Sequence, residues 1–240
     1  MVNHAIFMMK KIAITQSNYI PWKGYFETID TVDEFVLYDD VQYTRRDWRN
    51  RNQIKTPQGL FWLTIPVDVK GKYLQKINET CVSDAGWNVT HWKTIQANYA
   101  KAPFFKQHKD FFEELYLDCN ETFLSKINFR FLSGICQLIK IQTPITLSSD
   151  YLLEGDKTER LLNICTQSGS TAYYSGPAAK SYLDEALFQS RGVEVRWSDF
   201  SGYPEYPQLF PPFDHAVSII DLIFNVGAEN TKFFFKNLGA

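Results

Sequence analysis

Residues 11–52 constrain the fold more than any other part of this chain. They open with alternating apolar side chains over Lys11–Thr15, a pattern typical of a β-strand. The loop Gln16–Pro21 follows, because proline has no amide hydrogen and keeps the residue before it out of helical geometry. From Trp22 onward apolar residues recur at helical spacing, and Phe35–Tyr38 then predicts a second buried strand.

Strand, loop, helix and strand in this order make up half of a doubly wound parallel sheet. Ligands of such sheets bind in the crevice outside the carboxyl ends of the strands. Two segments are expected there: the loop Gln16–Pro21, and the neighbouring acids Asp39 and Asp40, which follow the second strand. The pattern therefore predicts where a functional site lies before it indicates any function.

The middle of the chain predicts a hairpin and a helical region. The turn Thr56–Gly59 separates two strand-like runs, so we expect a β-hairpin inserted at about residues 43–68. Apolar stripes at helical spacing fill about residues 87–141. Their aromatic side chains are expected to form core packing against the sheet rather than a ligand platform.

The last part of the chain returns to alternating strands and helices. Strands are expected at residues 144–147, 171–174 and 193–197. Asp156 has the signature of a helix N-cap, and a second helix is expected from Pro177 to near Gly192. We therefore predict a single α/β domain over residues 1–240, with a Rossmann-like, mostly parallel sheet, an inserted hairpin and a helical subdomain.

Composition argues against several classes of protein. The net charge of −2 lacks the strongly basic balance expected of a partner of duplex nucleic acid. No apolar run approaches the about 20 residues of a membrane span. Residues 1–11 lack the features of a secretory signal peptide. The four cysteines are widely spaced, so we expect reduced, mostly buried thiols and no metal site in a cytoplasmic protein.

Four guanidinium groups crowd the entrance to the expected hairpin, and they repel one another unless negative charge lies between them. They belong to Arg45, Arg46, Arg49 and Arg51. Acidic neighbours such as Asp47 supply that charge in one interpretation, which makes the group a surface ion-pair network. In the other, the group clamps a phosphate or diphosphate.

The candidate catalytic groups are Asp39, Asp40 and His91. Adjacent carboxylates repel, which raises the pKa of one of them and suits it to act as a general base. Side chains of adjacent strand-end residues point to opposite sides, so only one of the two acids is expected to face the crevice. His91 is an alternative base, although a single histidine beside Trp92 is also typical of core packing.

Further side chains complete the predicted binding site. They are Gln16, Asn18, Tyr19, Trp22, Gly24, Tyr25, Tyr43, Ser175, Asp221 and Asn225. The polar groups of the first loop have an alternative role in capping its turn. Ser218, Asp221 and Asn225 share one face of an apolar helix, so they either form structural hydrogen bonds or line the site.

The chain resembles the WbqC-like family over most of its length. The resemblance rests on separated blocks in a fixed order: Gln16, Asn18-Tyr19, Pro21–Phe26, Asp39-Asp40 with Tyr43, Asn50–Asn52, Lys157-Thr158 with Arg160–Leu162, Tyr174–Ala179, and Ser218–Asp221 with Phe224-Asn225 and Gly227. It implies a place in bacterial polysaccharide and O-antigen gene clusters. It also implies a glycine transferase activity on an amino sugar of lipopolysaccharide.

The leading functional hypothesis is an N-acyl or aminoacyl transferase acting on the amine of a nucleotide-linked amino sugar. The arginines would hold the diphosphate, Trp22 and Tyr25 would stack on base or sugar, and an acid would take the amine proton. Acyl-CoA, aminoacyl-tRNA and an amino acid with ATP all stay open as donors, and the cofactor and the oligomeric state are unknown.

Two other classes of function stay open. An ATP-dependent, adenylate-forming ligase is one, because residues 22–25 stand where nucleotidyltransferases carry an H-x-G-H turn, although both histidines are absent here. A non-catalytic protein that binds sugar nucleotides is the other, since no nucleophile or metal motif is found.

Overall fold

Within residues 9–236, which the computed structural model of the protein describes, the central element is a five-stranded sheet. Its spatial order is β5 (Ile145–Leu147), β2 (Glu34–Leu37), β1 (Lys11–Thr15), β6 (Ala172–Ser175) and β7 (Glu194–Trp197). All neighbouring strands run parallel. The predicted Rossmann-like α/β fold is therefore confirmed, and the strand order reverses between β1 and β6.

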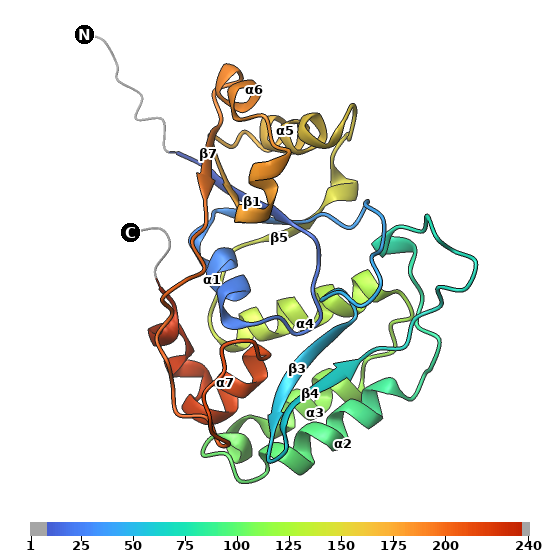
Figure 1. The fold of residues 1–240 in the computed structure, drawn as a ribbon, viewed down its shortest axis with the longest axis vertical. Coiled ribbons are helices and arrows are strands. Elements are labelled where there is room, and N and C mark those ends of the chain that lie inside the picture. Colours follow the sequence, from blue (N-terminus) through green and yellow to red (C-terminus); the bar gives the residue numbers. More distant parts are fainter. Residues whose placement is uncertain (1–8, 237–240) are drawn as a thin grey trace.

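Alternate residues of each strand enter two different cores, one on each face of the sheet. Ala13 and Phe35 lie side by side in register and belong to the larger core, whereas Ile12 and Val36 belong to the smaller one. The smaller core is covered by α5 (Lys157–Gln167) and α6 (Glu185–Ser190). The larger core contains α1 (Lys23–Thr31), α4 (Leu124–Leu138) and α7 (Ile219–Val226), on the opposite side of the sheet (Figure 1).

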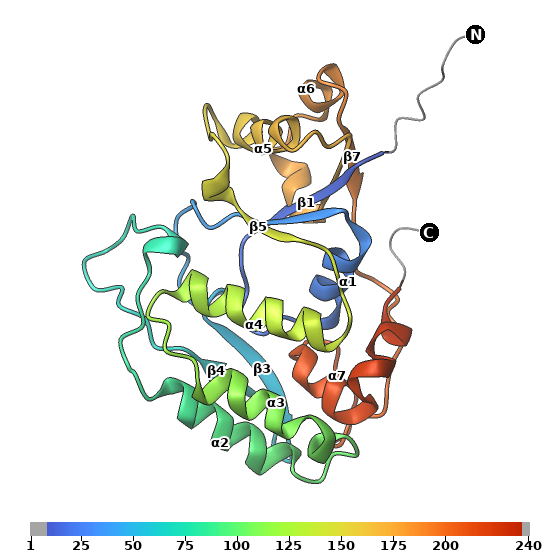
Figure 2. The same cartoon turned by 180° about the vertical axis from the view of Figure 1, so that it is seen from behind.

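The predicted hairpin is present as β3 (Arg51–Thr56) and β4 (Gly59–Thr64), which pair antiparallel. The predicted helical region contains α2 (Trp87–Tyr99) and α3 (Phe105–Leu117) before α4. Seen from the other side, α4 lies between the central sheet and the pair formed by α2 and α3 (Figure 2).

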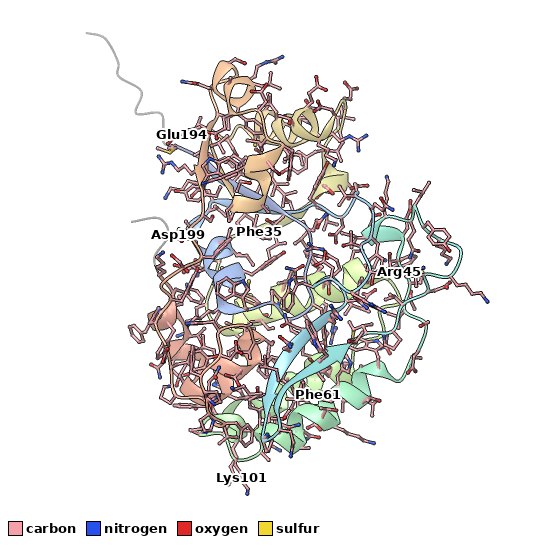
Figure 3. The ribbon with its side chains drawn as sticks, viewed as in Figure 1. Phe35, Arg45, Phe61, Lys101, Glu194 and Asp199 are labelled. Carbon is pink, nitrogen blue, oxygen red and sulfur yellow. The ribbon has the colours of Figure 1, made fainter. Side chains whose placement is uncertain are left out.

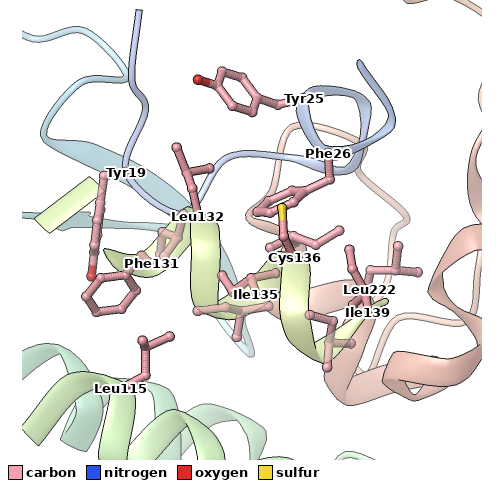
Figure 4. Packing of buried hydrophobic residues seen from close by; sticks show 14 of the residues in the cluster. Tyr19, Tyr25, Phe26, Leu115, Phe131, Leu132, Ile135, Cys136, Ile139 and Leu222 are labelled. Carbon is pink, nitrogen blue, oxygen red and sulfur yellow. The ribbon is translucent and has the colours of Figure 1, made fainter. Parts of the chain in front are cut away.

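Helix α4 links the parts of the larger core. Phe131, Leu132 and Ile135 are fully buried on this helix. They lie among Tyr19 from the first loop, Phe26 from α1, and residues of α3 and α7 (Figure 4). Burial of side chains of this size contributes about 1.5–3 kcal/mol each to stability. The first loop is thus anchored to the core by Tyr19 and is not a free surface loop.

The capping prediction for α5 is confirmed. The Asp156 side chain accepts hydrogen bonds from the amides of Thr158 and Glu159, and Glu159 accepts one from the Asp156 amide. The prediction of one helix from Pro177 to near Gly192 is wrong. Pro177 starts only a short 3-10 helix, which ends at Ser181. The helix α6 is separate from it, and the Asp184 side chain caps α6 by accepting a hydrogen bond from the Leu187 amide.

No helix in the described part of the chain is long and apolar enough to cross a membrane. Most of the segment examined for a signal peptide, residues 1–8, lies outside the described residues.

Candidate functional site

A cavity of about 920 Å³ opens at the carboxyl ends of β1 and β6, where the strand order reverses. We call it the switch-point cavity. Its lining includes Thr15 and Gln16 at the end of β1, Tyr38 and Asp40 after β2, and Ser175 and Gly176 at the end of β6. Lys76, Arg49 and the start of α5 complete it. This is the position at which open parallel sheets bind their ligands.

Asp40 provides a fixed carboxylate in this cavity. One of its oxygens accepts a hydrogen bond from Ser148 Oγ at 2.7 Å. The other accepts one from Asn78 Nδ2 at 3.1 Å and lies 3.6 Å from Lys76 Nζ. These donors orient the carboxylate, while its side chain keeps access to the cavity.

The start of α5 brings two cations to the same cavity, Lys157 and Arg160. Arg160 Nε donates to the carbonyl of Gly155 at 3.1 Å, which holds its guanidinium beside the helix start. Cations in the first turn of a helix are disfavoured by the helix dipole, whose amino end is positive. Two of them at this point indicate a role that outweighs that cost, such as binding an anion.

Positive charge predominates among the residues that line the cavity. The cations are Arg49, Lys76, Lys157 and Arg160, and the acids are Asp40 and Asp156. Asp156 is engaged in capping α5, so its charge is already neutralised in part by helix amides. The arrangement suits a ligand with at least two negative charges, and the volume falls within the range of small-molecule sites.

Arg49 is the one predicted arginine that lines the cavity. It donates hydrogen bonds to the carbonyls of Gln16 and Ser17 and to Asn18 Oδ1. Asp47 lies 3.6 Å from its other terminal nitrogen. Arg49 therefore holds the first loop in place through these hydrogen bonds, and Arg49 itself also lines the cavity.

The other three predicted arginines do not converge on this point. Arg45 donates to the carbonyl of Val69 and lies over the Tyr73 ring, at the side of the molecule (Figure 3). The Arg51 guanidinium lies 4.1 Å from the centre of the Trp62 ring and donates to the carbonyl of Arg46. Arg46 is exposed and has a positive φ of 57°. A clamp of four arginines is therefore not assembled.

Asp39 lies on the other side of the strand end from Asp40. It is 4% exposed, does not line the cavity and accepts a hydrogen bond from the Ser17 amide at 2.8 Å. Burial raises the pKa of this carboxyl. Its observed contact supports the first loop, which leaves Asp40 as the acid in contact with the cavity.

His91 is enclosed in the core of the helical region. Its Nε2 donates to the carbonyl of Thr64 at 3.1 Å, so Nδ1 of the neutral ring accepts from the Tyr19 hydroxyl at 2.9 Å. Burial lowers the pKa of His91 to about 4. It lines neither this cavity nor any other described here, so it is not part of the candidate site.

Four further predicted ligand residues lie in the interior: Tyr25, Tyr43, Asp221 and Asn225. Tyr25 supports the first loop by donating from its hydroxyl to the carbonyl of Gln16 at 3.0 Å. Tyr43 is buried in the larger core. Asp221 accepts hydrogen bonds from the hydroxyls of Tyr99 and Tyr206, and Asn225 donates to the Asp221 carbonyl. The hydrogen bonds of these two side chains are thus made within the protein, and neither residue lines a cavity described here.

A second, smaller cavity of about 310 Å³ lies beyond the first loop. It is lined by Asn18, Pro21, Trp22, Trp48, Asn52, His215 and Ala216, and we call it the aromatic pocket. Gln16 and Ser175 of the prediction thus line the switch-point cavity, whereas Asn18 and Trp22 line the aromatic pocket. Gly24 lies under the Trp22 ring.

Among residues 9–236, no group of three or more histidine, cysteine or acidic side chains is arranged to hold a metal ion. The four cysteines are unpaired, and Cys119, Cys136 and Cys165 are buried.

The sequence prediction of the site missed Lys76, Lys157 and Arg160. The signal for the last two was present, because a lysine and an arginine within four residues of the N-cap Asp156 oppose the helix dipole. Lys76 lies on an irregular segment that folds back toward Asp40. No local sequence pattern indicates the contact between these two side chains.

Comparison with known proteins gives a family but no activity. The profile of the WbqC-like protein family matches residues 16–233. The uncharacterized protein Rv1507c of Mycobacterium tuberculosis is 52% identical over 221 residues, which cover 92% of this chain and 96% of that protein. No solved structure matches.

Proposed function

Because the chain belongs to the WbqC-like protein family, we propose that it transfers an acyl or aminoacyl group, with glycine as the leading candidate, to the amine of a nucleotide-linked amino sugar. The product would serve bacterial surface polysaccharide synthesis, including O-antigen. In this proposal the switch-point cavity binds the sugar nucleotide.

The observation that supports the proposal most directly is the set of cations around this cavity. A nucleoside diphosphate carries its charge on two adjacent phosphates, and Arg49, Lys76, Lys157 and Arg160 supply both planar and point-like cations. Tyr173 and Gly176 line the same space, which leaves room for a sugar or base beside the charged part.

Asp40 is the proposed general base. The amine nitrogen of the sugar attacks the carbonyl carbon of the donor, and an N–C bond forms. The bond from that carbon to the carrier oxygen or sulfur breaks with its electron pair. Asp40 accepts the amine proton and returns it to the leaving carrier. A carboxylate with fixed hydrogen bonds is oriented for this transfer without a conformational change.

The binding step is tested with UDP and dTDP by titration calorimetry. We expect K157Q and R160Q each to weaken the binding of the nucleotide that binds wild type best by about tenfold or more, since each removes a charge-assisted contact to phosphate. The exposed Lys93, which lines no described cavity, provides the control K93Q. If both cavity variants bind as tightly as wild type and K93Q, the cavity is not the diphosphate site.

The chemical step is tested by mass spectrometry of amino sugar nucleotides incubated with the protein and mixed donors. We expect D40N to lose turnover by about 100-fold or more while it still binds nucleotide, because only proton transfer is removed. E121Q, at an exposed acid on the helical side, is the control. Full turnover in D40N contradicts the assignment of the base, and nucleotide binding without turnover for any donor favours a non-catalytic binding protein.

A further inference from the structure

The aromatic pocket has walls that are already fixed. A Cβ built on Gly24 would lie 2.4 Å from Cζ2 of Trp22, so only glycine allows the indole to fold over the start of α1. Tyr203 and Phe200 pack edge-on against the same ring, at 5.0 and 5.8 Å between centres. Trp22 is therefore held in one orientation by its neighbours.

The second indole is held from the hairpin side. The carbonyl of Trp48 accepts a hydrogen bond from the Tyr19 amide at 3.0 Å, which fixes its backbone to the first loop. Its ring lies 5.3 Å from that of Trp62, and the residue is 40% exposed. An exposed indole that is fixed in place beside a cavity is typical of a stacking surface for a planar ligand.

The polar groups of the pocket differ in whether they already have hydrogen-bond partners. Asn52 is saturated, since it donates to the carbonyls of Tyr19 and Ile20 and accepts from the Gln53 amide. His215 differs, because its Nδ1 is buried and has no hydrogen-bond partner within residues 9–236. Burial and the charge of Lys23 lower the pKa of His215, so the ring is neutral at pH 7 and able to donate or accept one hydrogen bond.

We propose that the aromatic pocket binds the adenine ring of the acyl donor, which deepens the proposed function and rests on it. Two indoles favour a flat ring over a flexible chain. His215 lines the same pocket with a polar ring, which favours a planar ligand that carries hydrogen-bonding nitrogens over a pure hydrocarbon. The three donor classes that stay open, acyl-CoA, aminoacyl-tRNA and an acyl-adenylate made from ATP, all carry an adenosine unit.

The two cavities are separated by only a few residues of the first loop. Gln16 lines the switch-point cavity and Asn18 lines the aromatic pocket, and Arg49 bonds to both of these residues. A donor that enters through the aromatic pocket therefore approaches the sugar nucleotide across residues 16–18. The amine and the acyl carbon would meet next to the Gln16 side of this loop.

The test uses protein labelled with 5-fluorotryptophan and titrated with adenosine, which has no charge for the switch-point cavity. The chain has six tryptophans, so the spectrum is small enough to assign with single Trp→Phe variants. We expect adenosine to shift the resonances of Trp22 and Trp48 and to leave Trp92 and Trp197 in place. Resonances of Trp22 and Trp48 that do not move at millimolar adenosine overturn the proposal, as does tighter binding of uridine or thymidine than of adenosine.

Gly24 offers a variant that perturbs the pocket without removing an aromatic ring. We expect G24A to displace the Trp22 indole and to weaken adenosine binding by about 5- to 100-fold, the range for losing one stacking partner. G86A is the matched control, because a Cβ at Gly86 meets only Asp84 Oδ1 at an ordinary 3.4 Å. W48F, at an exposed position, provides a second variant if G24A does not fold. Wild-type affinity in both pocket variants contradicts the proposal.

Failure of this inference is distinguishable from failure of the proposed function. K157Q and R160Q weaken UDP or dTDP binding if the switch-point cavity is the sugar nucleotide site, and they leave adenosine binding unchanged. G24A weakens adenosine binding if the aromatic pocket is the adenine site, and it leaves UDP or dTDP binding unchanged. Loss of only one of these effects identifies which cavity is wrongly assigned.

Discussion

Asp39 and Asp40 are neighbours in the chain, but their carboxylates have different surroundings. Asp39 is buried and supports the first loop, whereas Asp40 lines the switch-point cavity. The alternation of side chains along an extended segment predicts that one acid faces the crevice. Which one depends on how the segment after β2 lies against Ser17 and Ser148, and these contacts come from residues distant in sequence.

His91 predicts a specific loss of stability in acid. Its pKa is lowered from the usual 6.5 to about 4 by burial, so the unfolded chain binds the proton first as the pH falls. Stability from the neutral ring is present above pH 6.5 and is lost as the pH falls toward 4. We expect this histidine alone to reduce the free energy of unfolding by about 2 kcal/mol between pH 7 and pH 5.

The variant H91Q removes the titrating group and keeps side-chain hydrogen-bonding capacity. Urea denaturation of both proteins at pH 7 and pH 5 measures the effect. H91Q starts from a lower stability because its packing is imperfect. Between pH 7 and pH 5 its free energy of unfolding should fall by about 2 kcal/mol less than that of wild type. An equal loss in the two proteins contradicts the buried, neutral state of His91.

At the scale of the element, the cap of α5 links stability to ligand binding. The Asp156 side chain binds two amides at the start of the helix that carries Lys157 and Arg160. We expect D156A to lower stability by about 1 kcal/mol and also to weaken UDP or dTDP binding, because the first turn that positions both cations loosens. Chemical denaturation and calorimetry measure the two effects.

D184A is the matched control for this prediction. Asp184 caps α6 through a single amide, and α6 does not line the switch-point cavity. We expect a similar or smaller loss of stability with unchanged nucleotide affinity. If D156A behaves like D184A in both measurements, the start of α5 plays no part in binding.

Local patterns predicted most elements because strands and capped helices depend on neighbouring residues. Lys11–Thr15 has a short apolar centre that is buried as a strand, and Asp156 with Glu159 forms a complete capping box. The segment after β6 was mispredicted because Pro177 starts a helical turn, but the chain near Tyr182 leaves helical geometry before Asp184 starts a new helix. Proline at a helix start gives no information on where the helix ends.

At the scale of the whole molecule, Asp221 joins three parts of the larger core. It is fully buried on α7 and accepts hydrogen bonds from Tyr99 of α2 at 2.7 Å and from Tyr206 of the proline-rich segment at 2.8 Å. We expect D221A to lower the free energy of unfolding by about 3–5 kcal/mol, because two buried hydroxyls lose their acceptor. D221N, which keeps one acceptor oxygen, should lose less.

Urea denaturation at pH 7 measures both variants. The control is D110A, at an exposed acid on α3 whose nearby Lys109 forms only a surface ion pair. A loss in D221A no larger than that in D110A contradicts the structural role of Asp221 and reopens the alternative that it serves a ligand.

Sequence reasoning predicted a site at the carboxyl edge of the sheet, where the switch-point cavity lies, and named Gln16, Asp40 and Arg49, which line that cavity. It failed for the arginine group because spacing along a loop does not define direction. Arg45 and Arg51 each bind a backbone carbonyl and an aromatic ring elsewhere. The cations that do converge come from segments far apart in sequence, and only the strand order of the sheet brings them together.

The switch-point cavity has one wall from residues 14–76 and the other from residues 155–182. The intervening residues contain α2, α3 and α4, which contribute nothing to its lining. During synthesis, the amino-terminal wall therefore leaves the ribosome long before the other one exists. The complete set of cations forms only after β6 has added beside β1, so we expect a nascent chain stalled in the helical region not to bind UDP or dTDP as the full chain does.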